Sequence, residues 1–166
     1  MGKWNYLKMS KYVPDLLVDK LDDINLLTLK EKGINYLLVD VDNTLVDLRS
    51  EEPTSSALIF LEKARDNGIH VILISNNFKK RVSSLADRFK VPYISFALKP
   101  FPFLYKRIMK KYKVTKNELA AIGDQIFTDI AGAKNMGIYA IYVKPFSDND
   151  RLTTKVLRKL ERRILK

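Results

Sequence analysis

The stretch that decides the fold runs Ile34-Asn35-Tyr36-Leu37-Leu38-Val39-Asp40-Val41-Asp42-Asn43-Thr44. It joins a short apolar run, typical of a buried strand, to two carboxylates placed where that strand would end. In an open parallel sheet, ligands bind beyond the carboxyl ends of the strands, so Asp40 and Asp42 stand where chemistry is usually done. The alternative is a strand end with two solvated acids, and the rest of the chain decides between them.

Length and composition predict one globular domain with a single core, because the chain has 166 residues and 46% of them are hydrophobic. No cysteine is present, which excludes disulfides, thiolate zinc sites and a cysteine nucleophile. The apolar runs are far shorter than the roughly 20 residues that cross a bilayer, and residues 1–6 contain no continuous apolar segment. We therefore expect a cytoplasmic protein, peripheral at the inner membrane face.

The charge is strongly basic, with 30 Lys and Arg residues against 19 acids and a formal net charge of +11. This excess favours an anionic partner, either a phospholipid membrane surface or nucleic acid. In residues 146–166, apolar side chains recur four apart among many basic ones, which predicts a basic amphipathic helix. Such a helix either packs on the domain or binds lipid headgroups. Residues 3–12 interleave aromatics with lysines, which suits a membrane interface or a loop packed on the body.

Helical and strand patterns alternate along the chain. We expect short helices over 16–24 and from Thr28 to Gly33, then strands over 34–39, 69–74, 93–96, 119–122 and 138–143, with helices over 53–67, 78–89, 102–112 and 128–136 between them. This alternation predicts an α/β fold with a doubly wound parallel sheet and helices on both faces. The predicted organisation is a single domain, with residues 1–33 packed on a core of residues 34–145 and residues 146–166 as a tail.

Polar residues follow each later strand at similar intervals. Ser75-Asn76 follows the second of these strands, Lys99-Pro100 the third, and Gly123-Asp124 the fourth, with Asp129 shortly after. Because right-handed crossovers bring the carboxyl ends of parallel strands to one edge, these side chains are expected to converge on Asp40.

The ordered set Asp40-Val41-Asp42-Asn43-Thr44, Ser75, Lys99-Pro100 and Gly123-Asp124-Gln125-Ile126-Phe127-Thr128-Asp129 resembles the four motifs of the haloacid dehalogenase superfamily of phosphotransferases. The resemblance spans residues 34–143 and implies a Rossmann-like, three-layer α/β/α fold. More narrowly, the first, second and fourth motifs look like subfamily IIIA, in the branch similar to phosphatidylglycerophosphate phosphatases. Residues 45–52 have room for a short flap and none for a cap domain.

The resemblance implies roles for these residues. Asp40 would attack phosphorus and form an aspartyl-phosphate, and Asp42 would act as general acid and then general base. Lys99 would neutralise charge on the phosphoryl group during transfer. The phosphoryl oxygens would be held by Ser75, Asn76 and Thr44.

The acids of the site also predict a metal. At about 4 Å and an effective dielectric near 20, each like-charged pair costs about 4 kcal/mol, and one lysine does not offset several such pairs. A few carboxylates, a backbone carbonyl, waters and a phosphate oxygen describe magnesium, Mg2+, better than calcium. The expected ligands are Asp40, the backbone carbonyl of Asp42 and Asp124, with Asp129 as a secondary ligand, and Gly123 is expected to allow the turn before Asp124.

A site without a cap suits a large or surface-held substrate. The sequence therefore predicts a magnesium-dependent phosphatase that converts phosphatidylglycerophosphate to phosphatidylglycerol. One alternative is a nucleic-acid end (3'-) phosphatase, for which the basic charge would be favourable. Another is a receiver-like phosphorylatable switch domain, which also uses an acidic pair, a hydroxyl residue and a lysine. That design places the phosphorylated aspartate on a later strand than its acidic pair, unlike this chain.

Overall fold

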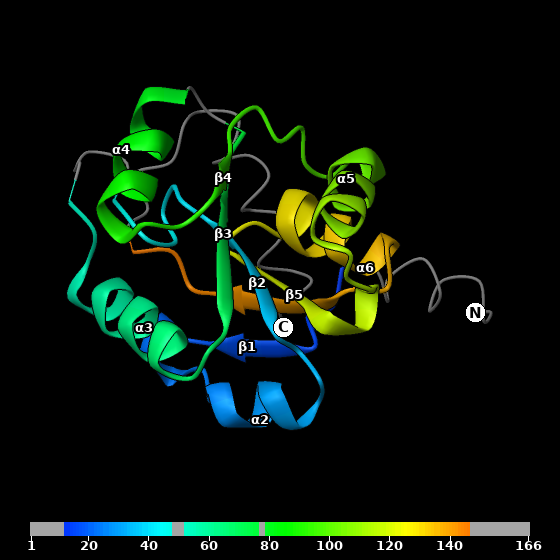
Figure 1. Cartoon of the computed structure of the whole chain (residues 1–166), viewed down its shortest axis with the longest axis horizontal. Helices are drawn as coiled ribbons and strands as arrows, with labels where there is room; N and C mark the ends of the chain where they lie inside the picture. The colour runs from blue at the N-terminus through cyan, green and yellow to red at the C-terminus, as the bar shows by residue number, and fades with distance from the viewer. Residues whose placement is uncertain (1–11, 48–51, 77–78, 147–166) are drawn as a thin grey trace, which may run out of the picture.

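The structure is a computed structural model that describes residues 12–47, 52–76 and 79–146 (Figure 1). The expected aromatic segment up to Lys11 and the expected tail helix beyond residue 146 lie outside these ranges. The described strands form one six-stranded sheet in the order β1-β6-β5-β2-β3-β4, and every neighbouring pair is parallel. The strands are β1 Leu16–Val18, β2 Tyr36–Asp40, β3 His70–Ile74, β4 Tyr93–Ile94, β5 Leu119–Gly123 and β6 Tyr139–Val143. The predicted α/β fold with a parallel sheet is confirmed.

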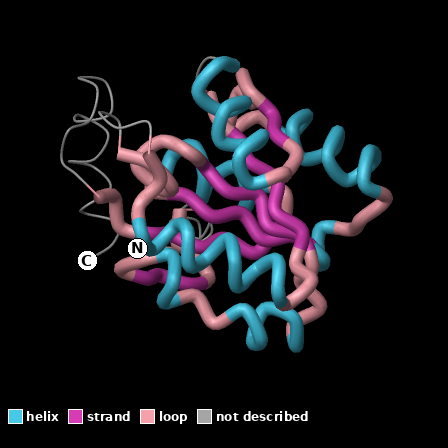
Figure 2. The backbone as a smooth tube through the Cα atoms, turned by 60° about the vertical axis from the view of Figure 1, so that its left-hand side comes forward, coloured by secondary structure: helices cyan, strands magenta, loops and turns pink. Residues whose placement is uncertain are grey.

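Helices cover both faces of this sheet, and Figure 1 shows α3 and α4 on one side and α5 and α6 on the other. The strand layer between helices is also visible in Figure 2. The helical elements are η1 Leu21–Asp23, α2 Leu26–Glu31, α3 Ser55–Asp66, α4 Lys79–Phe89, α5 Pro102–Tyr112, η2 Lys116–Glu118, η3 Ile126–Ile130 and α6 Ala131–Asn135.

The alternation of side chains along the central strands divides the core in two. In β2, Leu37 and Val39 belong to the cluster under α3 and α4, whereas Leu38 belongs to the cluster under α5 and α6. A strand buried on both faces reads as a continuous apolar run, which is why residues 36–39 lack the polar alternation of a half-exposed strand. The two clusters pack against opposite faces of the sheet and so fix the strands whose carboxyl ends carry the polar residues.

The expected helix over residues 16–24 is wrong, because Leu16–Val18 forms the edge strand β1. β1 pairs with β6, and its ends are fixed by hydrogen bonds from the Asp15 amide to the Ala140 carbonyl (2.8 Å) and from the Lys144 amide to the Val18 carbonyl (3.1 Å). Leucine spacing alone indicated a helix, but β6 offers backbone groups that need partners, and tertiary pairing outweighs that local preference.

The start of α2 also differs from the expectation. The helix begins at Leu26, and its N-cap is Asn25, whose side-chain oxygen accepts a hydrogen bond from the Thr28 amide at 3.1 Å. The predicted start at Thr28 is therefore too late, since asparagine caps a helix as well as threonine does. Gly33 ends this unit as predicted, with φ of +81°.

Among the described residues, no helix combines the length and the apolar character needed to cross a bilayer.

Core packing gives a first test. Ile72 lies in the middle of β3 and is 1% exposed, so Ile72→Ala should lower the free energy of unfolding by about 2–5 kcal/mol. The matched change Ile59→Ala, at a site on α3 that is 41% exposed, should change it by about 0.5 kcal/mol or less. Urea denaturation of both variants measures the difference, and equal losses would contradict the assigned core.

Candidate active site

The predicted site residues converge at one edge of the sheet. Asp40 is the last residue of β2, which lies between β5 and β3. After it the chain turns sharply: Asn43 has a φ of +62°, and the amides of Leu45 and Asn43 donate to the carbonyls of Val41 and Val46 at 2.9 and 2.8 Å. Asparagine tolerates this left-handed conformation better than most residues. The turn places Asp42 at the same edge as Asp40.

Lys99 links two of the acidic residues of the site, Asp40 and Asp129. Its Nζ lies 2.5 Å from Asp40 Oδ1 and 2.5 Å from Asp129 Oδ1, and all three side chains are buried. Charge-assisted hydrogen bonds of this kind are stronger than neutral ones, and they are stronger still away from water. One ammonium thereby holds the carboxylate of Asp40, at the end of β2, and that of Asp129, in the helical segment η3 that follows β5.

The position of Lys99 is set by Asn76, through a contact that sequence reasoning did not foresee. The Asn76 side chain donates from Nδ2 to the Lys99 carbonyl (3.1 Å) and accepts from the Lys99 amide at Oδ1 (2.9 Å). This reciprocal pair ties the loop after β3 to the loop after β4. Asn76 was expected to bind the substrate phosphate, and that role stays a prediction, whereas its side chain here positions the lysine backbone.

Two hydroxyl groups orient two of the carboxylates. Ser75 Oγ donates to Asp42 Oδ2 at 3.1 Å, and Thr44 Oγ1 donates to Asp124 Oδ1 at 3.5 Å. Both hydroxyl residues are fully buried. The expected contacts of Ser75 and Thr44 with phosphate stay predictions, but their hydrogen bonds already fix the directions of Asp42 and Asp124.

Three carboxylates fit a divalent cation. Asp40, Asp124 and Asp129 each present an oxygen, these oxygens lie within 4.8 Å of one another, and all three residues are buried. Asp40 Oδ2 is buried and has no hydrogen-bond partner among the described residues. A buried, unpartnered carboxylate oxygen beside two further acids is a donor set suited to a hard cation such as magnesium. The predicted ligand side chains are therefore brought together.

Electrostatics at the site point the same way. Burial raises the pKa of the Asp40 carboxyl well above its usual range, Lys99 opposes this rise, and the neighbouring Asp129 and Asp124 add to it. Burial by itself lowers the pKa of Lys99, but Asp129 and Asp40 outweigh that effect and raise it, so the ammonium stays protonated. The single cation does not balance the acids, and a divalent ion would favour the ionised form of Asp40.

Gly123 has a different role from the one expected. The sequence suggested that it allows a turn before Asp124, but it is the last residue of β5 and an added Cβ would lie 2.3 Å from Asp129 Cγ. The reason for glycine is thus the close approach of the Asp129 side chain to the backbone. Pattern reasoning could flag the glycine but could not show which side chain packs against it.

This close approach is testable. Gly123→Ala should push Asp129 away from Lys99, lower magnesium affinity and reduce phosphatase turnover by at least about 10-fold, since small displacements at a reacting centre are costly. Gly33→Ala is the control, because an added Cβ there meets no atom within 4 Å and only the left-handed backbone is strained. Steady-state kinetics over a magnesium series measures both, and wild-type turnover in Gly123→Ala would refute the role.

The sequence of this chain is similar to those of known proteins. Residues 13–137 match the haloacid dehalogenase-like hydrolase family. A probable phosphatase of Bacillus subtilis, YqeG, is 32% identical over 154 residues, which cover 93% of this chain and 90% of the relative.

Solved structures agree at the level of the fold. An uncharacterized protein from Listeria monocytogenes superposes with a TM-score of 0.57 at 17% identity, over 72% of this chain and 85% of that one. The cobalt-bound deoxy-D-mannose-octulosonate 8-phosphate phosphatase of Haemophilus influenzae gives 0.52 at 16% identity, over 82% and 90%. With the family match over most of its length and a relative at 32% identity, the chain belongs to the haloacid dehalogenase-like hydrolases.

Proposed function

We propose that this hydrolase removes the terminal phosphate of phosphatidylglycerophosphate, which is its phosphate monoester. The reaction is magnesium-dependent and passes through a phosphorylated Asp40. Phosphomonoester hydrolysis is the chemistry that the family and the paired carboxylates Asp40 and Asp42 support. The lipid substrate is supported by the likeness of the motifs to the phosphatidylglycerophosphate phosphatase branch and by the basic charge of the chain.

The observation that carries the choice of substrate is the shortness of the connections between the motif residues. In the described part of the chain, α3 and β3 are the regular elements between Thr44 and Ser75, and α4 and β4 are those between Ser75 and Lys99. Each of these two crossovers is thus one helix and one strand of the sheet itself, and the described residues between the motifs form no added domain. A headgroup presented by a surface can reach such a site, whereas a small free metabolite would be enclosed poorly.

In the first half of the reaction, a carboxylate oxygen of Asp40 bonds to phosphorus while the bond from phosphorus to the alcohol oxygen breaks. Asp42, held by the Ser75 hydroxyl, donates a proton to the leaving alcohol. Lys99 is already at Asp40 and stabilises charge on the phosphoryl oxygens as they pass.

In the second half, Asp42 takes a proton from water as that water attacks phosphorus of the acyl phosphate. The bond from phosphorus to Asp40 breaks, inorganic phosphate leaves, and Asp40 returns to its carboxylate form. When bound, a magnesium ion held by Asp40, Asp124 and Asp129 would lower the repulsion between these acids and the anionic substrate. Two hydrogen bonds orient the carboxylates that would hold the ion. The Thr44 hydroxyl donates to Asp124 Oδ1 at 3.5 Å, and the backbone amide of Gln125 donates to Asp129 Oδ2 at 3.2 Å.

A phosphorylated nucleic-acid end is the second candidate, favoured by the net charge of +11. The receiver-like switch is set aside, because the family match identifies a hydrolase.

A substrate panel tests the proposal. Phosphate release should be fastest with phosphatidylglycerophosphate in detergent micelles, and slower with a DNA 3'-phosphate end and a soluble sugar phosphate at the same concentration. Asp40→Asn should lower release by several orders of magnitude, because the amide is a poor nucleophile for phosphorus. Asp66→Asn, an exposed site on α3, is the matched control and should keep wild-type rates. Faster release from sugar phosphate or DNA than from the lipid would reject the assigned substrate.

Metal binding has a readout that is independent of turnover. Magnesium at about 100 times its dissociation constant should add about 2.7 kcal/mol to stability, which corresponds to a rise in Tm of about 5–10 °C for a chain of this size. Asp124→Asn should shrink the rise, whereas Asp66→Asn should preserve it. Differential scanning fluorimetry with and without magnesium measures the shift, and an equal shift in both variants would place the ion elsewhere.

A further inference from the structure

The segment between β4 and α5 presents large apolar side chains to water. Phe96, Leu98, Phe101 and Phe103 are 53%, 53%, 59% and 49% exposed, while Ala97 and Lys99 between them are buried. Ordinary packing would put the smaller alanine and the charged lysine outside and the larger residues inside. This inverted pattern surrounds the catalytic Lys99, and a cluster of this kind marks an interaction surface.

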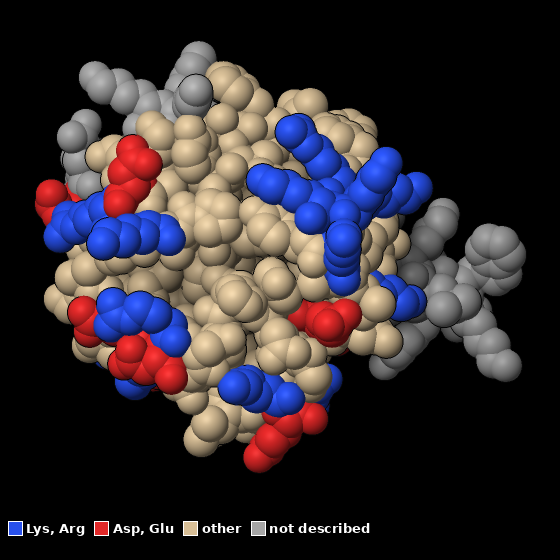
Figure 3. Space-filling view, in the orientation of Figure 1, with Lys and Arg blue, Asp and Glu red and all other residues tan. Residues whose placement is uncertain are grey.

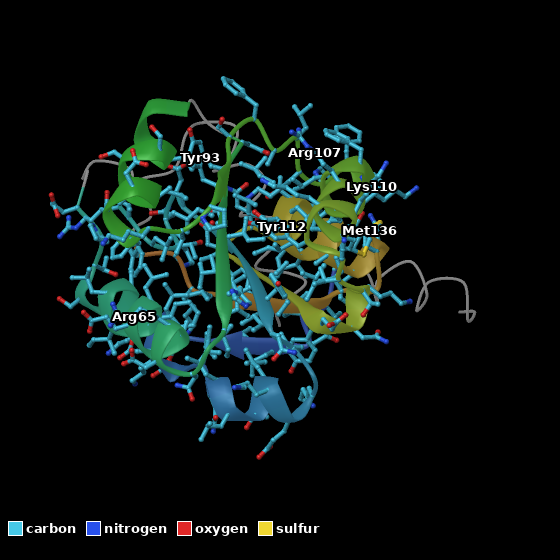
Figure 4. All side chains as sticks on the ribbon, viewed as in Figure 1. Arg65, Tyr93, Arg107, Lys110, Tyr112 and Met136 are labelled. Atoms are coloured by element: carbon cyan, nitrogen blue, oxygen red, sulfur yellow. The ribbon has the colours of Figure 1, made fainter. Side chains whose placement is uncertain are left out.

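The outer face of α5 continues this surface with basic residues. Lys106, Arg107 and Lys110 follow Phe103 at three, four and seven positions, so they share its face of the helix, and all are exposed. Figure 3 shows Lys and Arg side chains gathered over α5, whereas basic and acidic side chains are mixed on the α3 side. Arg107 and Lys110 project from the outer side of α5 in Figure 4, and Arg65 lies on α3 across the molecule.

A cleft lies beside this face. It has a volume of about 270 Å³ and is lined by Tyr93, Ile94, Ser95, Arg107, Ile108 and Lys111. Ser95 directly precedes Phe96, so the cleft adjoins the apolar cluster. Arg107 and Lys111 stand four apart on the helix, and a guanidinium, an ammonium and the Ser95 hydroxyl lining one cleft are donors that suit a phosphate group.

We propose that these residues form a docking surface for an anionic lipid bilayer. The docking surface consists of Phe96, Leu98, Phe101 and Phe103 with Lys106, Arg107, Lys110 and Lys111. The apolar side chains enter the interfacial region, the basic residues contact the headgroups, and the cleft takes one lipid phosphate. This inference rests on the proposed function in one respect, namely that the substrate lies in the bilayer. The residues of the docking surface are different from those of the expected tail helix and aromatic segment.

A bilayer fits the composition of the surface better than nucleic acid or a second copy of this chain. Phenylalanine rings can stack on nucleic-acid bases, but Leu98 cannot, and four apolar side chains without a polar tip suit insertion at the acyl-chain boundary of a bilayer. A second copy would bring the same basic face towards itself, and like charges would oppose that contact. Apolar residues flanked by Lys and Arg are the composition that binds at anionic membrane interfaces.

The orientation that follows serves the chemistry. Lys99 stands between Leu98 and Phe101 in the chain, so docking of these side chains brings the strand-end edge with Asp40 against the headgroups. A phosphate monoester in that layer would meet the site without leaving the bilayer.

The test is cosedimentation of the full chain with vesicles of phosphatidylcholine alone or mixed with phosphatidylglycerol, neither of which carries a phosphate monoester. Arg107→Gln with Lys111→Gln should weaken partition onto the mixed vesicles by about 30-fold, from a factor of about 5 per basic residue. Phe96→Ser with Phe101→Ser should also weaken it. The matched controls, Lys63→Gln with Arg65→Gln and Leu27→Ser with Ile59→Ser, remove equal charge or exposed apolar side chains elsewhere and should bind as wild type. Thermal unfolding checks that every variant is folded.

Unchanged partition in the Arg107 and Lys111 variant, equal losses in the controls, or equal binding to neutral vesicles would each overturn the docking surface. The docking surface would also be overturned if the wild-type chain were a dimer at the concentrations of the cosedimentation experiment and the Phe96→Ser, Phe101→Ser variant were a monomer. The two proposals fail separately: hydrolysis of the lipid in micelles without vesicle binding rejects docking alone, and vesicle binding without hydrolysis rejects the substrate alone.

Discussion

The contact on which the site depends is the ammonium of Lys99 between Asp40 and Asp129. Each of these groups is buried, and an unpaired buried charge costs several kcal/mol, so none would be tolerated there alone. Two uncharged residues position this ion-pair cluster. Asn76 hydrogen-bonds the backbone of Lys99, and Gly123 leaves room for the side chain of Asp129. The fold therefore supplies a charged centre in which one ammonium faces several carboxylates, and a divalent cation would reduce the remaining negative charge.

Much of this arrangement could be predicted because it is written in local patterns. An apolar run ending in Asp40, repeated helix and strand periods, and polar residues after successive strands are enough to indicate a parallel sheet with its chemistry at one edge. The spacing of Ser75, Lys99 and Asp124 indicates convergence because crossover geometry leaves few other arrangements. The strand bounds agree within two residues, since β-branched and apolar residues cluster where the sheet is buried.

The parts that could not be predicted all rest on contacts between distant residues. Residues 16–24 have helical leucine spacing, and only the pairing with β6 makes residues 16–18 a strand. Asn76 reads as a polar loop residue until its two hydrogen bonds to Lys99 are seen. The exposed Phe96 and Leu98 lie in a stretch that reads as a strand end, and the backbone there takes positive φ values of 50° and 53° that no propensity indicates.

The place of β4 in the sheet has a consequence for how such an enzyme can change. Asp40 ends the interior strand β2 and Asp124 follows the interior strand β5, and each of these strands pairs with a neighbour on both sides. Phe96 and Leu98 belong to the loop after β4, the two-residue strand at the rim, and the cleft is lined by residues of β4 and α5. Substitutions at the rim disturb few buried contacts, so they are tolerated more easily than substitutions at the centre. Divergent relatives can therefore change what they bind through residues near the edge strand β4, while the residues at the ends of β2 and β5 keep the same reaction.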